Sequence, residues 1–389
     1  MRSLSSLVAL GATAQNVITN ILPNNTGHLF EPSAGPVHMK FEGPLLPDTY
    51  KRPLFNDYGF VLRGNTTEGE DWSLWLFMYR QIGNSEFIMP EDIFQLSLIH
   101  GAYSQEEKKV MHDNDFATKG QSVEDYRPTG TIKTKYHEDY VSWSYEGFTM
   151  ERYHDHWEAH GIYNNITVDL TMYQRGDMVY HAGKFDALEN CDASTPHENF
   201  DCFGAAGGIV HLQNVTGTLV TKEGKKMDLD VAHGVHERIM NAGVVPPRVE
   251  EGAGRGASWF HSWGEKVSWW SFYEDAGPFA VGLTNVDNQT YYTSGLPNVT
   301  IEEQASWIDP RSHFLVPFKW RTWQRYDDGF LESYGTGYAR LYYYWLRNKG
   351  LITVYQYLGD SVTTFTRKDG SVLREKTMAF LEFMRDTIA

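Results

Sequence analysis

The chain has 389 residues, of which 41% are hydrophobic, and this length predicts two domains or one large β architecture. Its formal net charge is -16 and no basic block stands out, which argues against nucleic acid and anionic membrane surfaces as partners. After the N-terminal leader, no apolar stretch approaches the ~20 residues of a membrane-spanning helix.

The N-terminus has the features of a secretory signal peptide over residues 1–15. Arg2 supplies a positive charge, Leu4 to Leu10 form a short apolar run, and Ala12-Thr13-Ala14 has the small-x-small form of a cleavage site. The alternative is a fraying first helix or strand. Six N-x-S/T sequons support the secretory pathway, secreted or vesicular, and predict asparagines on exposed turns. The sequons begin at Asn24, Asn65, Asn165, Asn214, Asn288 and Asn298.

Most of the remaining chain predicts β-strands, because aromatic residues reach 14% and alternating segments are separated by turn signals. We expect an all-β protein with an N-terminal β-sandwich-like domain over 16–250, a C-terminal barrel over 251–389 and few short helices. The Pro/Gly-rich stretch 241–258 marks the boundary, although it could also be a loop over a pocket. A short helix is expected within 104–116, and 374–388 predicts a closing helix or, alternatively, a final strand.

The two cysteines, Cys191 and Cys202, enclose the polar segment "DASTPHENFD". In an oxidising compartment this spacing predicts a disulfide that closes a short loop. In the chain-entropy model, a loop of roughly 12 residues would contribute about 3 kcal/mol.

The segment "ERYHDHWEAHG" raises the possibility of a metal or acid–base site. On a regular strand, His154, His156, Glu158 and His160 would share one face. Three imidazoles there could bind zinc, and a polar strand face is the alternative. No other segment offers a matching set of ligands, so we predict no metal and keep only His156 as a catalytic candidate.

A second candidate for acid–base chemistry is "VAHGVHERIMN". On a strand, His233 and Glu237 would share one face, with His236 on the other. A histidine beside an acid suits general acid–base catalysis, because each can tune the pKa of the other. A purely structural His/Glu pair is the alternative.

Tryptophans are concentrated in "WFHSWGEKVSWW", and further aromatic residues follow in "FKWRTWQRYDDG" and "LYYYWLR". Such density either fills a β core or lines a site for a flat apolar ligand. The candidate substrate-binding residues are Trp259, His261, Trp263, Trp270, Tyr273, Trp323 and Tyr343. The chain lacks the G-x-S-x-G elbow, the phosphate-binding loop, H-E-x-x-H and a dinucleotide fingerprint, so we predict no cofactor.

Three segments resemble the two-domain lipocalin-like superfamily of hydroxyneurosporene synthases and kievitone hydratases. They are the Trp-rich strand "EDWSLWLFMYR", the hairpin-containing "GTLVTKEGKKMDLDVAHGVHERIMN" and a second Trp-rich strand, "VSWWSFYEDAGPFAVG". With its leader and sequons, the chain most resembles the fungal hetero-Diels–Alderases of tropolone–sesquiterpene pathways. Where relatives have Asp-His and then Trp-Gly, this chain has Val235-His236-Glu237, so His236 would match the family histidine and Glu237 would be the acid.

The resemblance implies an apolar pocket at the barrel mouth or between the domains, and apolar terpenoid or polyketide-derived substrates. The leading hypothesis is a cofactor-free pericyclase for a hetero-Diels–Alder cycloaddition, with dehydration to a quinone methide as one route to the reactive partner. A hydratase or dehydratase of a prenyl or polyene double bond is the first alternative. The second is a non-catalytic carrier of an apolar metabolite. The oligomeric state is left open.

Overall fold

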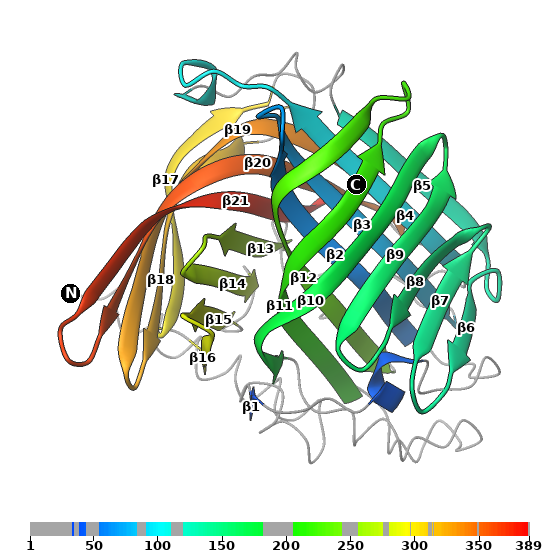
Figure 1. Cartoon of the computed structure of the whole chain (residues 1–389), viewed down its shortest axis with the longest axis horizontal. Coiled ribbons are helices and arrows are strands. Elements are labelled where there is room, and N and C mark those ends of the chain that lie inside the picture. The colour runs from blue at the N-terminus through cyan, green and yellow to red at the C-terminus, as the bar shows by residue number, and fades with distance from the viewer. Residues whose placement is uncertain are drawn as a thin grey trace.

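The computed structural model describes most of the chain beyond the N-terminal segment. The described residues are 33–34, 39–43, 54–83, 91–109, 120–181, 205–242, 256–274, 280–295, 297–309, 313, 315–347 and 350–387. Within them, strands form two large antiparallel sheets, which are called sheet A and sheet B here (Figure 1). The all-β fold predicted from the sequence is confirmed.

Sheet A has twelve strands from the first part of the chain, in the order β5-β4-β3-β2-β12-β11-β10-β9-β8-β7-β6, with β1 paired to β10. One of its long strands, over 166–180, comes from a segment in which apolar and β-branched residues alternate with polar ones. The strands are β1 (Ser33–Ala34), β2 (Leu54–Thr66), β3 (Asp71–Ile82), β4 (Glu91–Gly101), β5 (Gly120–Pro128), β6 (Lys133–Tyr136), β7 (Val141–Tyr145), β8 (Phe148–Arg152), β9 (His156–Tyr163), β10 (Ile166–Tyr180), β11 (Ala205–Val220) and β12 (Lys226–Ala242).

Sheet B has nine strands from the second part, in the order β16-β15-β14-β13-β21-β20-β19-β18-β17. Its strands are β13 (Gly256–Trp263), β14 (Val267–Glu274), β15 (Ala280–Val286), β16 (Gln289–Ser294), β17 (Val299–Ile308), β18 (Leu315–Tyr326), β19 (Gly329–Arg347), β20 (Gly350–Arg367) and β21 (Val372–Thr387). Two single-turn 3-10 helices, η1 (Met39–Glu42) and η2 (Glu107–Lys109), are the helices of the described residues.

Each sheet curls until strands far apart in its order face each other across a hydrophobic core. In sheet A, Phe94 of β4 stacks on Tyr145 of β7 with ring centroids 5.1 Å apart. In sheet B, Phe260 of β13 meets Trp320 of β18 edge to face at 5.6 Å. Aromatic pairs in these geometries add to the stabilisation that burial alone provides, so each sheet encloses a core of its own.

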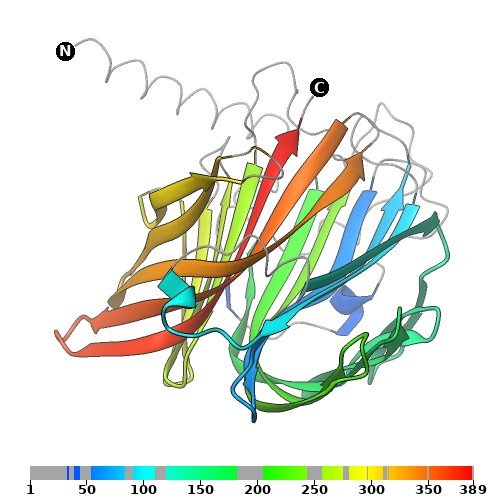
Figure 2. The ribbon, with the colours of Figure 1, turned by 90° about the horizontal axis from the view of Figure 1, so that it is seen from above.

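The two sheets lie against each other along their outer faces (Figure 2). A third hydrophobic core fills this contact, which is called the seam. Strand β3 illustrates why both of its faces are apolar. Trp72 points into the curl of sheet A, whereas Trp75 and Phe77 point into the seam. The second Trp-rich strand, β14, divides its adjacent tryptophans similarly, with Trp269 inside sheet B and Trp270 in the seam. The Trp-rich strands therefore join two cores each.

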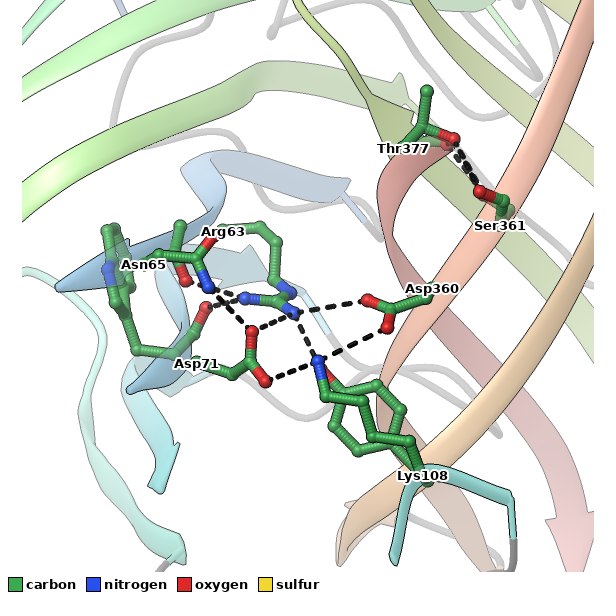
Figure 3. A network of polar contacts seen from close by, with 11 residues as sticks. Arg63, Asn65, Asp71, Lys108, Asp360, Ser361 and Thr377 are labelled. Carbon is green, nitrogen blue, oxygen red and sulfur yellow. Dashed lines mark hydrogen bonds and ion pairs between the residues drawn. The ribbon is translucent and has the colours of Figure 1, made fainter. Parts of the chain in front are cut away.

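A polar network fastens the two sheets at one end of the seam (Figure 3). Arg63 of β2 donates to Asp71 of β3 at 3.2 Å and to the hydroxyl of Tyr338, on β19, at 2.8 Å. Lys108 of η2 pairs with Asp71 at 2.7 Å and with Asp360, on β20, at 3.2 Å. This network, called the clasp, balances two cationic side chains against two carboxylates across the two sheets.

The structure corrects one expectation about helices and tests another only in part. The segment 374–388 does not form a closing helix, because Val372–Thr387 is strand β21, paired with β20 and β13 along its length. The apolar residues of this segment also have a spacing that fits a helix. Their alternating burial against two partner strands favours the strand instead. In 104–116, the described part contains only the 3-10 turn η2. No helix among the described residues is long and apolar enough to cross a membrane.

Candidate active site at the seam

Strand β12 places the two central candidates, His236 and Glu237, on opposite faces of sheet A. Side chains alternate along a strand, so neighbours in sequence point in opposite directions. His236 faces the curl, where its ring lies 4.8 Å from that of Tyr58. Glu237 faces the seam, where its Oε1 accepts a hydrogen bond from the indole nitrogen of Trp259 at 3.2 Å. The two residues therefore belong to different sites.

His236 belongs to a buried ionic cluster that holds η1 inside the curl of sheet A. Its Nε2 lies 2.8 Å from Oε2 of Glu42, and its Nδ1 lies 2.9 Å from the carbonyl oxygen of Gly59. The other carboxylate oxygen of Glu42 pairs with the guanidinium of Arg152. His211 of β11 lies beside the same carboxylate, with its Nε2 3.9 Å from Oε1. These contacts join η1 to three strands of sheet A.

The charges of this cluster are consistent with a structural role. Burial opposes ionisation of Glu42, but His236 and Arg152 outweigh it and hold the pKa of Glu42 well below its ordinary value. Hydrogen bonds also fix the backbone of η1. Trp143 donates to the carbonyl oxygen of Glu42 at 2.8 Å, and Arg238 donates to the carbonyl oxygen of Gly43 at 2.9 Å. A permanently charged and fully paired carboxylate is poorly suited to protonating a substrate.

The side of β12 that carries Glu237 faces a different set of residues, which is called the seam cluster. Each of its residues contacts another one or pairs with it in register on a neighbouring strand. His181, just after β10, has its Nε2 3.8 Å from Oε1 of Glu237 and its ring 5.0 Å from that of Trp270. Trp270 pairs in register with His261 across β14 and β13, and Trp259 pairs with Glu382 across β13 and β21. The seam cluster comprises His181, Glu237, Trp259, His261, Trp270 and Glu382.

Burial favours the protonated, neutral form of the two acids of the seam cluster. Glu237 is 3% exposed, and burial raises its pKa well above the ordinary value of 4.5, with a further rise from the nearby Asp57. The hydrogen bond from Trp259 opposes this rise but does not cancel it. Burial also raises the pKa of Glu382 well above its ordinary value. A neutral carboxylic acid keeps an O–H that can be donated to a substrate.

The two histidines of the seam cluster are neutral. Burial lowers the pKa of His181 to about 3 and that of His261 to about 3. The ring of His261 lies 5.5 Å from that of Trp263, in a stacked orientation, and meets Phe380 edge to face. The seam cluster therefore combines neutral proton-carrying groups with aromatic walls, and it can donate and accept hydrogen bonds without presenting a net charge.

Four of the candidate substrate-binding residues lie in the seam. Trp259, His261 and Trp270 belong to the seam cluster, and Trp263 packs beside them and donates to the carbonyl of Gly234 at 3.2 Å. Of the catalytic candidates other than Glu237, His233 shares the seam face of β12, and its Nδ1 lies 3.0 Å from Oδ1 of Asn214. Burial lowers the pKa of His233 to about 4.

Three other candidates do not join them. Tyr273 follows Trp270 by three residues and so points to the opposite face of β14. Trp323 is half-buried on the outer face of β18, with the guanidinium of Arg321 4.8 Å from its ring centroid. The backbone of Tyr343 lies in β19, paired with Val354, and its side chain lies outside the description. Strand alternation explains the first two differences.

The histidine-rich segment lies away from the seam cluster. The segment 151–161 does not form one regular strand, because β8 ends at Arg152 and β9 begins at His156, which leaves His154 in the turn. His156 stacks on Tyr153 with ring centroids 4.8 Å apart, and its ring nitrogens face Asp155 and Glu158. Among the described residues, a different trio gathers potential metal ligands within 4.8 Å of one another. It consists of Glu151, Glu158 and His160.

The predicted modification sites are partly described. Asn165 and Asn288 lie on turns with positive φ, Asn298 lies on a turn, and Asn214 is exposed within β11. Asn65 departs from the exposed turn expected of it, since it lies half-buried in β2 and donates to Asp71 at 2.7 Å. Asn24, Cys191 and Cys202 lie outside the described residues, as does the proposed signal peptide.

Three residues of these sites were missed from the sequence. Glu382 lies in "MAFLEFM", where a single acid interrupts an apolar run, and interpreting that segment as a strand would have exposed the anomaly. His181 directly follows the last residue of β10, and its approach to Glu237 depends on the strand order within sheet A, where β11 lies between β10 and β12. Glu42 sits in a short turn with no periodicity that could have revealed its burial.

The fold is similar to that of solved structures. One is NE1406, an AttH candidate from Nitrosomonas europaea, with a TM-score of 0.54, 12% identity and coverage of 93% of this chain and 98% of that one. Another is CghA in complex with Sch210972, with a TM-score of 0.52, 9% identity and coverage of 86% and 88%. Kievitone hydratase from Nectria haematococca covers 93% of this chain and 99% of its own at a TM-score of 0.48 and 12% identity.

Searches by sequence give a different result. No protein-family model matches the chain, and no curated protein sequence matches it. At identities of 9–12%, the structural similarity establishes the fold. The resemblance predicted from the three sequence segments is thus confirmed as a resemblance in fold.

Proposed function

We propose that this chain is a cofactor-independent enzyme that activates an apolar, oxygen-bearing small molecule at the seam cluster, with Glu237 as the hydrogen-bond donor or acid. The observation that carries the proposal is a buried carboxyl group set among tryptophans, in surroundings that raise its pKa and so favour the protonated form. Such an acid in an apolar environment can donate to a carbonyl oxygen or protonate a leaving hydroxyl group at neutral pH. CghA, which shares the fold, has been solved with the small molecule Sch210972.

The reaction we favour is an intermolecular hetero-Diels–Alder cycloaddition between a polyene or terpene and an electron-poor enone or quinone methide. Such a reaction asks little covalent chemistry of a protein. Holding both partners in a near-attack geometry can lower the barrier by several kcal/mol, and a donor on the carbonyl of the electron-poor partner stabilises the developing charge. Trp259 and Trp270 supply flat apolar surfaces, and Glu237 supplies the donor.

A hydratase or dehydratase is the second candidate, and the contact between His181 and Glu237 favours it. Adding water to a double bond requires an acid that protonates the alkene carbon and a base that accepts a proton from water. Glu237 is neutral and acidic, and His181, 3.8 Å away, is an unprotonated imidazole. These are the protonation states that the two roles need at the start of the reaction.

Two substitutions of Glu237 separate these mechanisms. Glu237→Gln keeps the shape and a hydrogen-bond donor but cannot transfer a proton, whereas Glu237→Leu removes both. In a cycloaddition that needs only a donor, Glu237→Gln keeps most of the rate and Glu237→Leu loses it. In a hydration or dehydration, both variants lose about 10²–10⁴-fold, which is the usual contribution of general acid catalysis. Glu158→Gln, on the outer face of β9, is the matched control and leaves the rate unchanged.

The assay incubates the purified full chain with polyene and enone partners and follows the stereochemistry of the products. Equal product ratios from native and boiled protein would rule out catalysis and leave the carrier function. Incorporation of labelled oxygen from solvent water into the product identifies hydration, because a cycloaddition takes no oxygen from water.

A further inference from the structure

Most buried acids among the described residues have a cationic neighbour, and two of them do not. Seven aspartates and glutamates are buried among the described residues. Five of them have an arginine or lysine as a charge neighbour: Glu42 with Arg152, Asp57 with Arg238, Asp71 with Arg63, Asp92 with Arg80, and Asp309 with Arg340. The other two are Glu237 and Glu382, both in the seam cluster. Burying a carboxyl group without a counter-charge is costly, so this pairing needs a reason.

Among the described residues, Glu382 has no cationic partner, and one of its oxygens also lacks a hydrogen-bond partner. It is 2% exposed, and its Oε2 has no hydrogen-bond partner among the described residues. Its register partner on β20 is Gln356, which is fully buried and whose amide nitrogen and oxygen likewise lack a partner in the described part of the chain. Both side chains lie on the seam face of sheet B, the face that also carries Phe380. Unsatisfied polar groups of this kind are rare in folded proteins.

His261 extends this arrangement along the neighbouring strand. It follows Trp259 by two residues on β13, so it lies on the same face as Glu382 and Gln356. Neither of its ring nitrogens has a hydrogen-bond partner within the described ranges. Three adjacent strands, β13, β21 and β20, therefore each present a buried side chain with unused hydrogen-bonding capacity to the seam.

We propose that Glu382 and Gln356 form a second hydrogen-bonding station of the seam cluster, so that the site selects a neutral substrate with at least two separate oxygen functions. One oxygen is engaged by Glu237 from sheet A, and the other by Glu382 and Gln356 from sheet B. This inference rests on the proposed function in taking the seam cluster as the site. It adds Glu382 as a substrate-binding residue and specifies the class of molecule.

The chemistry of these groups matches a neutral ligand. Burial, with the nearby Glu237 and Asp57, raises the pKa of Glu382 well above its ordinary value, so that it carries a proton it can donate. The amide of Gln356 can both donate and accept. A carboxylate or an ammonium group would be buried here without an opposite charge, which is unfavourable. A ketone, enone or hydroxyl group meets no such penalty.

The binding test uses two terpenoid probes that differ by one oxygen: β-ionone, a neutral enone, and 4-oxo-β-ionone, a neutral dione. Quenching of tryptophan fluorescence by each probe gives its dissociation constant at pH 7. One additional hydrogen bond of ordinary strength predicts that the wild-type chain binds the dione up to about tenfold more tightly than the enone. Glu382→Leu reduces the ratio to about one, and so does Gln356→Leu. Glu382→Gln, which keeps shape and donor, preserves it.

A second measurement does not depend on any probe. A protonated carboxylic acid has a carbonyl stretch in the infrared that is well separated from the carboxylate bands, and Glu382→Gln removes one such band at pH 7. This variant changes no volume, so it remains informative if Glu382→Leu fails to fold. An unchanged infrared spectrum in Glu382→Gln, or an unchanged binding ratio in Glu382→Leu, would overturn the second station.

The two proposals fail separately. If Glu237→Leu abolishes selective product formation while Glu382→Leu leaves the binding ratio unchanged, the proposed reaction stands and the second station is wrong. If Glu382→Leu eliminates the ratio while Glu237→Leu leaves product formation unchanged, the binding station stands and the role given to Glu237 is wrong.

Discussion

Replacing Glu237 with glutamine should change how the stability of the protein depends on pH. In the folded chain Glu237 is protonated, because burial and Asp57 raise its pKa well above 4.5. In the unfolded chain it is exposed and ionises near its ordinary value. Between that value and the raised pKa, the folded state therefore holds one more proton than the unfolded state. The free energy of unfolding of the wild type then falls as pH rises through this window.

The size of the effect follows from proton linkage. One additional proton bound by the folded state lowers the free energy of unfolding by about 1.4 kcal/mol for each pH unit. From pH 6 to pH 8, the wild type should lose about 2.7 kcal/mol through Glu237 on this linkage, provided the acid stays protonated when folded. Glu237→Gln has the same shape and no ionisable group, so it does not have this loss. The variant should gain stability relative to the wild type as the pH rises.

Urea unfolding at pH 5, 6, 7 and 8 measures the difference between the two proteins by linear extrapolation. Only the change of that difference with pH is used, so packing differences that do not depend on pH cancel. Glu158→Gln, a half-exposed residue of β9, serves as the control and should show no such trend. A difference between wild type and Glu237→Gln that stays constant over this range would mean that Glu237 is ionised in the folded protein, which would refute the acid assigned to the seam cluster.

Three further substitutions test the other contacts. Glu42→Gln leaves Arg152 buried without its counter-charge and should cost about 3–5 kcal/mol in urea unfolding at pH 7; a loss below 1 kcal/mol would contradict the ionic cluster. Trp259→Phe removes the donor that lowers the pKa of Glu237, so infrared titration of the carboxylic acid band should place that pKa higher than in the wild type; a lower or equal value would refute the contact. Lys108→Met removes two ion pairs of the clasp, and its cost of about 1 kcal/mol should shrink in 1 M salt, whereas a salt-independent loss would indicate packing instead.

Local patterns were sufficient to predict the strands and to group part of the candidate site. Alternation along 226–242 is enough to place His236 and Glu237 on opposite faces, and the tryptophans of 259–270 mark the seam. What local patterns could not show is which sheet face would meet another. Each face of β3 and β14 is apolar, so hydrophobicity does not distinguish the inside of the curl from the seam.

The remaining residues come together only through long-range packing. Glu42 meets His236 across an interval of 194 residues, and its segment has no periodicity that signals burial. A helix over the last segment would not have predicted the burial of Glu382. In a helix, Phe380 and Met384 share the apolar face and the acid between them lies on the surface. The strand assignment reverses this interpretation, because Phe380 and Glu382 then share one face.

The double-sided burial of β3 bears on how the protein can be divided. A fragment that contains sheet A alone would expose Trp75, Phe77 and Tyr79, which pack against sheet B in the whole chain. An apolar surface of this kind favours aggregation of a protein that is otherwise soluble. The two sheets should therefore behave as one cooperative unit that unfolds in a single transition, and the protein would be expressed and engineered as a whole chain.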